Sequence, residues 1–402
     1  MKRFFSTLMI AALALAAGAC SDSDNEDANG PVTSDFNVRS RGGNVMVTLP
    51  TADYVADIPS DAAWVEPSEQ SDAELVIFNV APNDTGADRA TTVSLYEAAT
   101  RRPLAYMRIR QAADSDLRSG DFVIEEIFYT FNILPETGKQ GDGGDQFIKI
   151  RNNTDRDLYA DGLMIIDSKL NSGQNFGFVD GGDPRPDYCI AADIFCIPGN
   201  GNDVLVKAGE TLLVCNQAQN HKATNSNSFD LTKADFEWFV ESTNENFLDV
   251  DNPAVPNLDV WYVNSLTLFI IHNRGYNCMA LAMPPAGMTK EKFLTDYAAE
   301  VPYIFHSPNG KDYNMTLKDC YKVPNAWVLD AVNTGVASTY VSGPWHSSLD
   351  AGYTYCHETA SDASAYGLSV RRKAGSDGKL VDTNNSTNDF TPRATPSLKE
   401  GE

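Results

Sequence analysis

The feature that most limits the fold of this chain is a long succession of short segments rich in β-branched and aromatic residues. Such segments recur over residues 45–49, 75–80, 90–96, 104–111 and 122–129. Runs of this length, separated by clusters of Gly, Pro, Asn and Asp, are typical of strands in β-sandwiches. Helical spacing of apolar residues occurs in few places, chiefly after a Thr232 capping position and over residues 290–299. The pattern therefore predicts a mainly β chain with a few short helices.

The N-terminal residues predict an export signal that ends at a cysteine. Two cations, Lys2 and Arg3, precede an apolar run over residues 8–17, and small residues then lead to Cys20. This run is shorter than a stable membrane span and is typical of a signal peptide. We interpret residues 1–19 as a lipoprotein signal and Cys20 as the lipid-bearing residue, although Ala17 stands where Leu is commonest. The alternative is an ordinary signal peptide with a cysteine at its cleavage site.

The segment after Cys20 is interpreted as a tether over residues 20–32. Its residues 21–27 are acidic or polar, and such a run stays solvated and extended. It resembles the acidic stretch that marks surface-exposed lipoproteins of the Bacteroidetes. That resemblance implies an outer-membrane protein anchored to lipid through Cys20 and facing the cell surface. Several acyl chains on one cysteine bury enough methylene groups for stable anchoring.

The charge of the chain excludes one class of partner. The formal net charge is −24, and removing residues 1–19 removes Lys2 and Arg3, which gives −26 for the mature chain. Such a surface repels phosphate backbones, so we expect no nucleic-acid partner. The longest later apolar candidate, residues 266–271, has only the length of a strand.

Residues 33–112 form the first predicted domain, a β-sandwich. They contain a Gly42-Gly43 turn, a single tryptophan (Trp64), a turn from Asn83 to Arg89, and a final strand that ends at Gln111. With these features the segment resembles the BACON family, the Bacteroidetes-associated carbohydrate-binding domain that is often N-terminal. The family name implies sugar binding, but a lone Trp in a small sandwich is more often a core residue. We therefore interpret this domain as a spacer, followed by a polar linker over residues 113–120.

Residues 121–402 form the second predicted domain. The pattern of its beginning and end resembles the lamin-tail domain, an immunoglobulin-like sandwich. The resemblance rests on residues 147–153, 161–163, 207–214, 369–372, 382–386, 389–390 and 395–397. It implies a second β-sandwich with long insertions between residues 168 and 360. As a whole, the chain resembles an uncharacterised family of Bacteroidetes surface lipoproteins for which no activity can be carried over.

Motifs for catalysis are missing from the sequence. There is no HExxH, GxSxG, P-loop or dinucleotide fingerprint. His346, Cys356, His357 and Glu358 could ligate a transition metal, but their spacing does not require it. Aspartates that cluster in turns, such as Asp142 and Asp145, usually bind nearby backbone amides. We expect no catalytic residue, no metal and no cofactor.

Apart from Cys20, the cysteines all lie in the second half of the chain: Cys189, Cys196, Cys215, Cys278, Cys320 and Cys356. An even number in an exported chain is compatible with disulfides. The one local pair, Cys189 and Cys196, predicts a bridge that closes a short loop. The alternative is that several of these residues are small buried apolar side chains.

Aromatic residues in or beside the insertions are the best sequence signal for binding. The candidates are Trp261, Tyr262, Trp345, Tyr353 and Tyr355. Aromatic faces outside a core can stack on sugars or anchor a protein partner. Trp327 lies inside an apolar run and is interpreted as a core residue.

These observations favour a non-catalytic binding or accessory protein that captures a glycan or small nutrient, for instance beside a TonB-dependent transporter. The alternative is an adhesion or scaffold protein with a protein partner. A second alternative is an extracellular hydrolase that uses carboxylates or a metal in the insertions. A deep pocket would favour capture, a flat apolar patch would favour adhesion, and a cleft with converging His and Asp would favour the enzyme.

Overall fold

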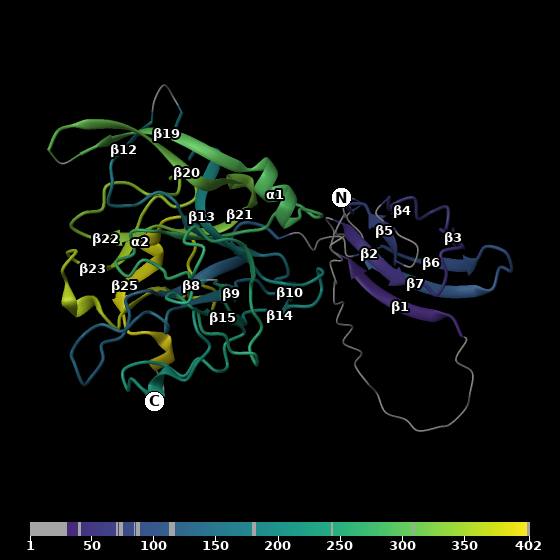
Figure 1. The fold of residues 1–402 in the computed structure, drawn as a ribbon, viewed down its shortest axis with the longest axis horizontal. Helices are drawn as coiled ribbons and strands as arrows, with labels where there is room; N and C mark the ends of the chain where they lie inside the picture. Colours follow the sequence, from purple (N-terminus) through teal and green to yellow (C-terminus); the bar gives the residue numbers. More distant parts are fainter. Residues whose placement is uncertain are drawn as a thin grey trace, which may run out of the picture.

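The computed structural model describes residues 30–38, 42–69, 71, 75–83, 85, 89–111, 117–178, 182–242, 244–307 and 309–399. The expected signal, Cys20 and the acidic tether lie outside the described residues. Within them the chain is mainly β, as predicted, and its helices are short (Figure 1). Among the described helices, none is both long enough and apolar enough to cross a bilayer.

The first body is a sandwich of two sheets formed by β1–β7. One sheet has the order β1-β7-β6-β3 and the other β2-β5-β4, and β1 pairs parallel with β7. The strands are β1 (Val32–Val38), β2 (Gly43–Thr48), β3 (Tyr54–Asp57), β4 (Val65–Pro67), β5 (Leu75–Val80), β6 (Arg89–Glu97) and β7 (Pro103–Gln111). Most of them coincide with runs expected from the sequence.

The residues singled out in this body close one end of the sandwich. Gly42 has φ +86°, and a Cβ there would meet the Val80 carbonyl oxygen at 2.2 Å, so only glycine fits this turn. Arg89 donates through Nε to Gln111 Oε1 at 2.7 Å, and its guanidinium lies 4.3 Å from the ring centre of Trp64. Trp64 is half-buried against the core of this body. Its place is therefore structural, as the sequence suggested.

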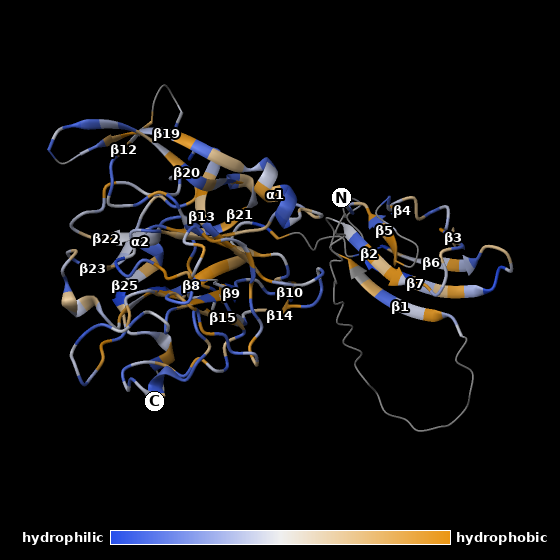
Figure 2. Ribbon diagram, viewed as in Figure 1, coloured by the Kyte–Doolittle hydropathy of each residue, from blue (hydrophilic) through white to orange (hydrophobic). Residues whose placement is uncertain are grey.

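The second body contains two large sheets that face each other. The first has the order β16-β15-β9-β8-β24-β25, so a strand near the C-terminus pairs with the first strand of this body. Its strands are β8 (Phe122–Phe128), β9 (Phe147–Asn152), β15 (Thr211–Cys215), β16 (Phe236–Glu237), β24 (Ser369–Arg372) and β25 (Phe390–Ala394). Along β8 the ribbon is largely hydrophobic (Figure 2).

The other large sheet has the order β12-β19-β20-β13-β11-β18-β21, and β17 also pairs with β13. Its strands are β11 (Met164–Ser168), β12 (Phe176–Phe178), β13 (Tyr188–Cys196), β17 (Asp259–Tyr262), β18 (Met279–Ala282), β19 (Ala298–His306), β20 (Asp312–Pro324) and β21 (Val328–Val332). Smaller pairs are formed by β10 (Leu158–Tyr159) with β14 (Leu205–Val206) and by β22 (Thr334–Val336) with β23 (Thr354–His357).

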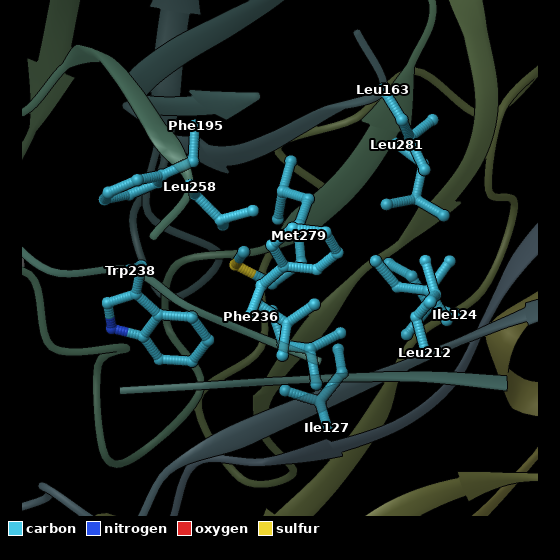
Figure 3. Packing of buried hydrophobic residues seen from close by; sticks show 14 of the residues in the cluster. Ile124, Ile127, Leu163, Phe195, Leu212, Phe236, Trp238, Leu258, Met279 and Leu281 are labelled. Carbon is cyan, nitrogen blue, oxygen red and sulfur yellow. The ribbon is translucent and has the colours of Figure 1, made fainter. Parts of the chain in front are cut away.

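The main core lies between these two sheets (Figure 3). Ile124 and Leu212 from the first sheet meet Met279, Leu281 and Phe195 from the other. Burying side chains of this size stabilises the fold by about 1.5–3 kcal/mol each. This core fixes the position of β13, and β13 in turn carries the strands that form the candidate site.

A β-bulge in β13 lets one strand contribute to two cores. Asp167 pairs with Asp193 but Ser168 pairs with Ala191, so Ala192 is an extra residue. The extra residue keeps Cys189 and Cys196 in the same apolar cluster, although an odd number of positions separates them. The segment 168–202, where the expected insertions begin, therefore contains a central strand.

The predicted disulfide between Cys189 and Cys196 is wrong. The two residues lie at opposite ends of β13, both buried, and neither is bridged. Seven residues of extended chain span about 23 Å, whereas bridged cysteines have Cα atoms less than about 7 Å apart. Both residues are small buried thiols, which was the alternative to a disulfide in the sequence analysis.

The sequence predicted only one of the short helices in the structure. Helix α1 (Lys290–Asp296) begins at Thr289, whose side chain accepts from the Lys292 amide, and it buries Phe293 as the spacing predicted. The expected helix after Thr232 is wrong, because Phe236 lies in β16. The apolar run over residues 266–271, which has the length of a strand, forms none in the structure. The remaining short helices are α2 (Ser386–Asp389), η2 (His221–Ala223), η3 (Asn325–Trp327), η4 (Ala363–Ala365) and η5 (Ser397–Lys399).

A buried ion network joins the C-terminal segment to this body. The Arg372 guanidinium contacts Asp330 at 2.6 Å and Asp382 at 3.2 Å, and its Nε donates to the Ile124 carbonyl oxygen at 2.8 Å. Asp389 lies 3.8 Å away. Since the Arg372 side chain is almost fully buried, these partners satisfy a charge that would otherwise be costly.

Candidate binding site

Three strands, β12, β19 and β20, leave the second body as a projecting arm (Figure 1). Directly opposite residues of paired strands point to the same side of a sheet. Between β19 and β20, the register pairs Tyr303 with Met315 and Phe305 with Tyr313. Between β12 and β19, it pairs Phe178 with Tyr303 and Phe176 with Phe305. One side of the arm, here called the aromatic face, is therefore formed by Phe176, Phe178, Tyr303, Phe305, Tyr313 and Met315.

The aromatic face is open toward its outer end. Tyr313 is 45% exposed and Met315 is 47% exposed, whereas Tyr303 is 9% exposed. The rings of Phe305 and Tyr313 lie 6.5 Å apart and near parallel, and Phe176 contacts Tyr303 at 4.9 Å. Large apolar side chains gathered on one exposed surface mark a place where another molecule can dock.

The opposite side of the arm is polar. His306 Nδ1 lies 2.7 Å from Asp312 Oδ1, and Lys318 forms an ion pair with Glu300 at 3.3 Å. This side also carries Pro302, which is exposed, and Ile304, which is half-buried. The large apolar side chains of the arm that are exposed, Tyr313 and Met315, lie on the aromatic face.

The base of the arm is fixed to the body. Val301, Cys320 and Ile190 form a small buried cluster. Beyond Asp319, which has φ +52°, β20 bends into the body and pairs with β13 through residues 321–324. Arg185 lies 5.1 Å from the ring centre of Phe178 and contributes a cation–π contact at the inner end.

Trp345, a predicted binding residue, is instead a core residue. It is 2% exposed, and its indole Nε1 donates to the Met279 carbonyl oxygen at 3.1 Å. A ring that is buried on all sides cannot stack on a ligand. This residue is removed from the candidate site.

The other predicted aromatic residues form two separate groups. Trp261 packs against Phe293 at 5.5 Å, and Tyr262 meets Tyr321 edge to face at 4.8 Å near the base of β20. Tyr353 stacks on Tyr340 at 3.8 Å and lies 6.1 Å from Tyr355. All four predicted residues named here are half-buried. The predicted set therefore does not converge on one site.

A pair of carboxyl groups lies beside the first of these groups. Asp193 and Asp167 face each other across β11 and β13 and are 8% and 5% exposed. Asp193 accepts from the Asn264 amide at 2.8 Å, whereas Oδ1 of Asp167 has no hydrogen-bond partner. Burial raises the pKa of both groups, to about 6 for Asp193 and well above its usual range for Asp167. The proximity of Asp193 raises the pKa of Asp167 further.

Histidines and turn aspartates have local roles. Burial lowers the pKa of His357 to about 4, and neither of its ring nitrogens has a hydrogen-bond partner. Asp161 accepts from the backbone amides of residues 201, 203 and 204. In the part of the chain that the structure describes, no group of three or more His, Cys, Asp or Glu is placed to hold a metal ion.

A polar hollow of about 360 Å³ lies elsewhere, between residues 134–145 and the loop over residues 221–228. Asp145 in its wall is held by Asn132 at 2.8 Å and by Ser228 at 2.5 Å. Its lining includes Leu134 and His221 but no Trp, Tyr or Phe. The exposed aromatic ring of Tyr313 is on the arm, and the lining of this hollow has none.

The sequence interpretation missed the aromatic face. Its signal was present as alternation of apolar and polar residues over 313–317, whereas in the run 301–306 Ile304 between Tyr303 and Phe305 breaks the alternation. Pro302 within the first run weakens a strand prediction, because proline cannot donate to a ladder. The partners in β12 could not be found this way, since residues 176–178 lie far along the chain.

One family model matches part of the second body. Residues 207–397 match a family model described as a protein of unknown function, DUF4876. This DUF4876 segment runs from the turn before β15 through β25 and includes α1, β19 and β20. It therefore contains most of the arm, together with the C-terminal strands of the first large sheet.

A solved structure supports the fold. A crystal structure of a DUF4876 family protein from Bacteroides thetaiotaomicron VPI-5482 aligns with a TM-score of 0.54 and 20% identity, covering 92% of this chain and 97% of that chain. At this identity the likeness shows the fold alone. No curated protein matches the chain.

Two glycoside hydrolases align only weakly. A GH5 xyloglucanase from Bacteroides ovatus, in complex with a XXXG heptasaccharide, has a TM-score of 0.18 and 16% identity over 28% of this chain and 22% of that chain. An endo-fucoidan hydrolase of family 107 has a TM-score of 0.17 and 12% identity, over 46% and 28%. These likenesses carry no argument about structure or activity.

Proposed function

We propose that this chain is an outer-membrane lipoprotein, anchored through Cys20 at the cell surface, that binds a ligand without transforming it. The N-terminal pattern of cations, apolar run, small residues and cysteine supports the anchor. The net charge and the acidic tether are compatible with a solvated protein held above a membrane. In this proposal the first sandwich is a BACON-like spacer, and the second body is a lamin-tail-like sandwich enlarged by its insertions.

The observation that carries the binding role is the aromatic face of the arm. Near-parallel rings on a firm sheet suit stacking on a pyranose ring or packing against an apolar nutrient. The arm stands away from the body, so a large ligand such as a polysaccharide can reach it. An accessory role beside a TonB-dependent transporter extends the proposal by analogy with other lipoproteins of this type.

Binding is tested with the mature chain and its Tyr313→Ala variant on a panel of soluble plant and host polysaccharides, by affinity electrophoresis. One stacking contact contributes about 0.5–1.5 kcal/mol, so we expect roughly two- to tenfold weaker binding. Tyr355→Ala is the matched control, because Tyr355 is a half-buried tyrosine outside the arm. Equal losses in both variants, or a loss in the control alone, would contradict the assignment to the arm.

The anchor is tested separately with Cys20→Ala. We expect the variant in the soluble fraction and the wild-type chain in the outer membrane, where protease added to intact cells should digest it. An unchanged membrane fraction for the variant would refute the anchor. Release of reducing ends from any polysaccharide in the panel would instead support the hydrolase alternative.

A further inference from the structure

The outer edge of β20 has no partner strand among the described residues. β20 pairs with β19 along the arm, but its other edge joins β13 only through residues 321–324. Residues 312–316, 318 and 319 are exposed. An edge of this length presents a row of backbone donors and acceptors that another strand can complete.

The register shows which backbone groups point outward. The Ser307 amide donates to the Lys311 carbonyl oxygen at 2.9 Å, so this opposite pair is hydrogen-bonded. Such pairs alternate with non-bonded ones in an antiparallel ladder. Pro302, which lacks an N–H, falls opposite Thr316 at a non-bonded position. The even-numbered residues Asp312, Asn314 and Thr316 therefore direct their N–H and C=O groups away from β19. Lys318 lies at the register shift beside Asp319, where the regular alternation ends.

This edge is complementary to itself. An antiparallel copy of β20 centred on Met315 places Asn314 opposite Thr316 of the second copy, and both have outward backbone groups. The same register places Asp312 opposite Lys318 of the second copy, and this occurs twice because of the two-fold axis. Within its own chain Asp312 contacts His306 and Lys318 contacts Glu300, so the contact between copies would extend these exposed pairs. Opposite charges that face each other across a ladder stabilise the pairing.

The side chains of the aromatic face match in the same register. Met315 meets its own counterpart, and Tyr313 lies opposite Leu317 of the second copy. These contacts would place the exposed side chains of the two copies side by side and join the two aromatic faces into one larger surface that stays open to solvent.

We propose that two copies of this chain associate through antiparallel pairing of their β20 edges, centred on Met315. The interface is isologous, so it closes a two-fold dimer and leaves no further edge at this position. Unlike a glycan or a lipid, a second strand can satisfy the alternating donors and acceptors of the edge. The proposal is independent of any ligand, and its failure would leave the proposed binding function untouched.

The charge pairs give the first test, on the detergent-solubilised full chain in sedimentation equilibrium. Asp312→Lys and Lys318→Asp each place like charges opposite one another, so we expect each to weaken the dimer at least severalfold. The double variant restores opposite charges in exchanged positions, and its dimer should recover. Both residues are exposed, so the far-UV circular dichroism spectrum at low temperature should remain unchanged and serve as the control for folding.

A register test uses cysteine pairs in the membrane fraction under mild oxidation. Met315→Cys places two sulfurs at a non-bonded opposite pair, whose Cα atoms lie about 4.5 Å apart, and should give a covalent dimer. In the Asn314→Cys dimer the two new cysteines are diagonal neighbours across the ladder. Their Cα atoms lie about 7–8 Å apart, which is too far for a disulfide. Asn314→Cys should crosslink only when mixed with Thr316→Cys. A monomeric wild-type chain, or equal crosslinking of Met315→Cys and Asn314→Cys alone, would overturn the proposal.

Discussion

Replacing Asp193 with asparagine should make the protein more stable at neutral pH and leave its stability nearly unchanged at pH 4. Asp193 lies on β13 opposite Asp167, and both carboxyl groups are almost fully buried. Burial disfavours the ionised form and raises the pKa of Asp193 to about 6. The wild-type chain therefore has to bury a negative charge whenever the pH exceeds that value.

The size of the effect follows from the two pKa values. An unfolded Asp has a pKa of about 3.9, so the folded chain holds its proton over about two further pH units. That difference corresponds to about 3 kcal/mol of destabilisation at neutral pH. Because the folded pKa is raised, stability falls as the pH rises from about 4 to about 6 and is level above that range. Asparagine keeps the acceptor for the Asn264 amide but must place an amide group beside Asp167, so about 3 kcal/mol is an upper value.

The measurement is chemical unfolding of both chains at pH 4.0 and pH 7.5, followed through tryptophan fluorescence. Trp238 and Trp345 are buried in the second body and report on it. Asp187→Asn is the matched control, because Asp187 is exposed and lies just before the same strand. An Asp193→Asn chain that is less stable at pH 7.5, or equally altered at both pH values, would show that the cost of burying this charge was misjudged.

Two further predictions concern the core and the thiols. Trp345→Ala should lower the free energy of unfolding by about 3–5 kcal/mol, because it leaves a cavity and removes the indole donor to the Met279 carbonyl oxygen; urea unfolding measures this, and a loss below 1 kcal/mol would show that the indole is not a core group. Burial raises the pKa of the thiols of Cys189 and Cys278 and hinders access to them, so the native chain should not react with an aromatic disulfide reagent, and the six cysteines that the structure describes should react only after unfolding. Rapid labelling of the native chain, or fewer reactive thiols in the unfolded chain, would contradict this second expectation.

The strands that the sequence predicts well are those with a simple pattern. β5 and β7 are short apolar runs bounded by turn residues, and β9 alternates strictly. In β7 and β9 the sequence pattern reflects one side that is more buried than the other. β5 buries Val76, Ile77 and Phe78 in succession and is recognised as an apolar run between turn residues. The mainly β class and the few helices follow from such segments.

The central strand β13 could not be predicted from its own residues. It lies in a segment rich in Gly, Asn and Pro, and its bulge at Ala192 interrupts the period-two pattern. Its role depends on β11, β17 and β20, which come from distant parts of the chain. Sequence patterns describe neighbours along the chain and carry little information on such pairings.

For the candidate site, the sequence predicted the type of residue but not which residues form it. Aromatic residues were the right type, but Trp345 is buried and the other four lie in two groups. What decides exposure is whether a second layer covers a given side of the sheet. For Tyr313 and Met315 that cover is missing, and no local property of residues 312–317 records it.

The pairing of β8 with β24 has a consequence for how the chain is made. The two strands lie more than 240 residues apart, and the Arg372 contact with the Ile124 carbonyl oxygen spans 248 positions. Contacts between such distant positions form late, because a long loop must close before they contribute. While the chain is being synthesised, β8 lacks its neighbour β24 until the final tenth of the polypeptide has been made. A premature stop codon near the 3′ end of the gene would therefore disable far more of the molecule than the few amino acids it removes.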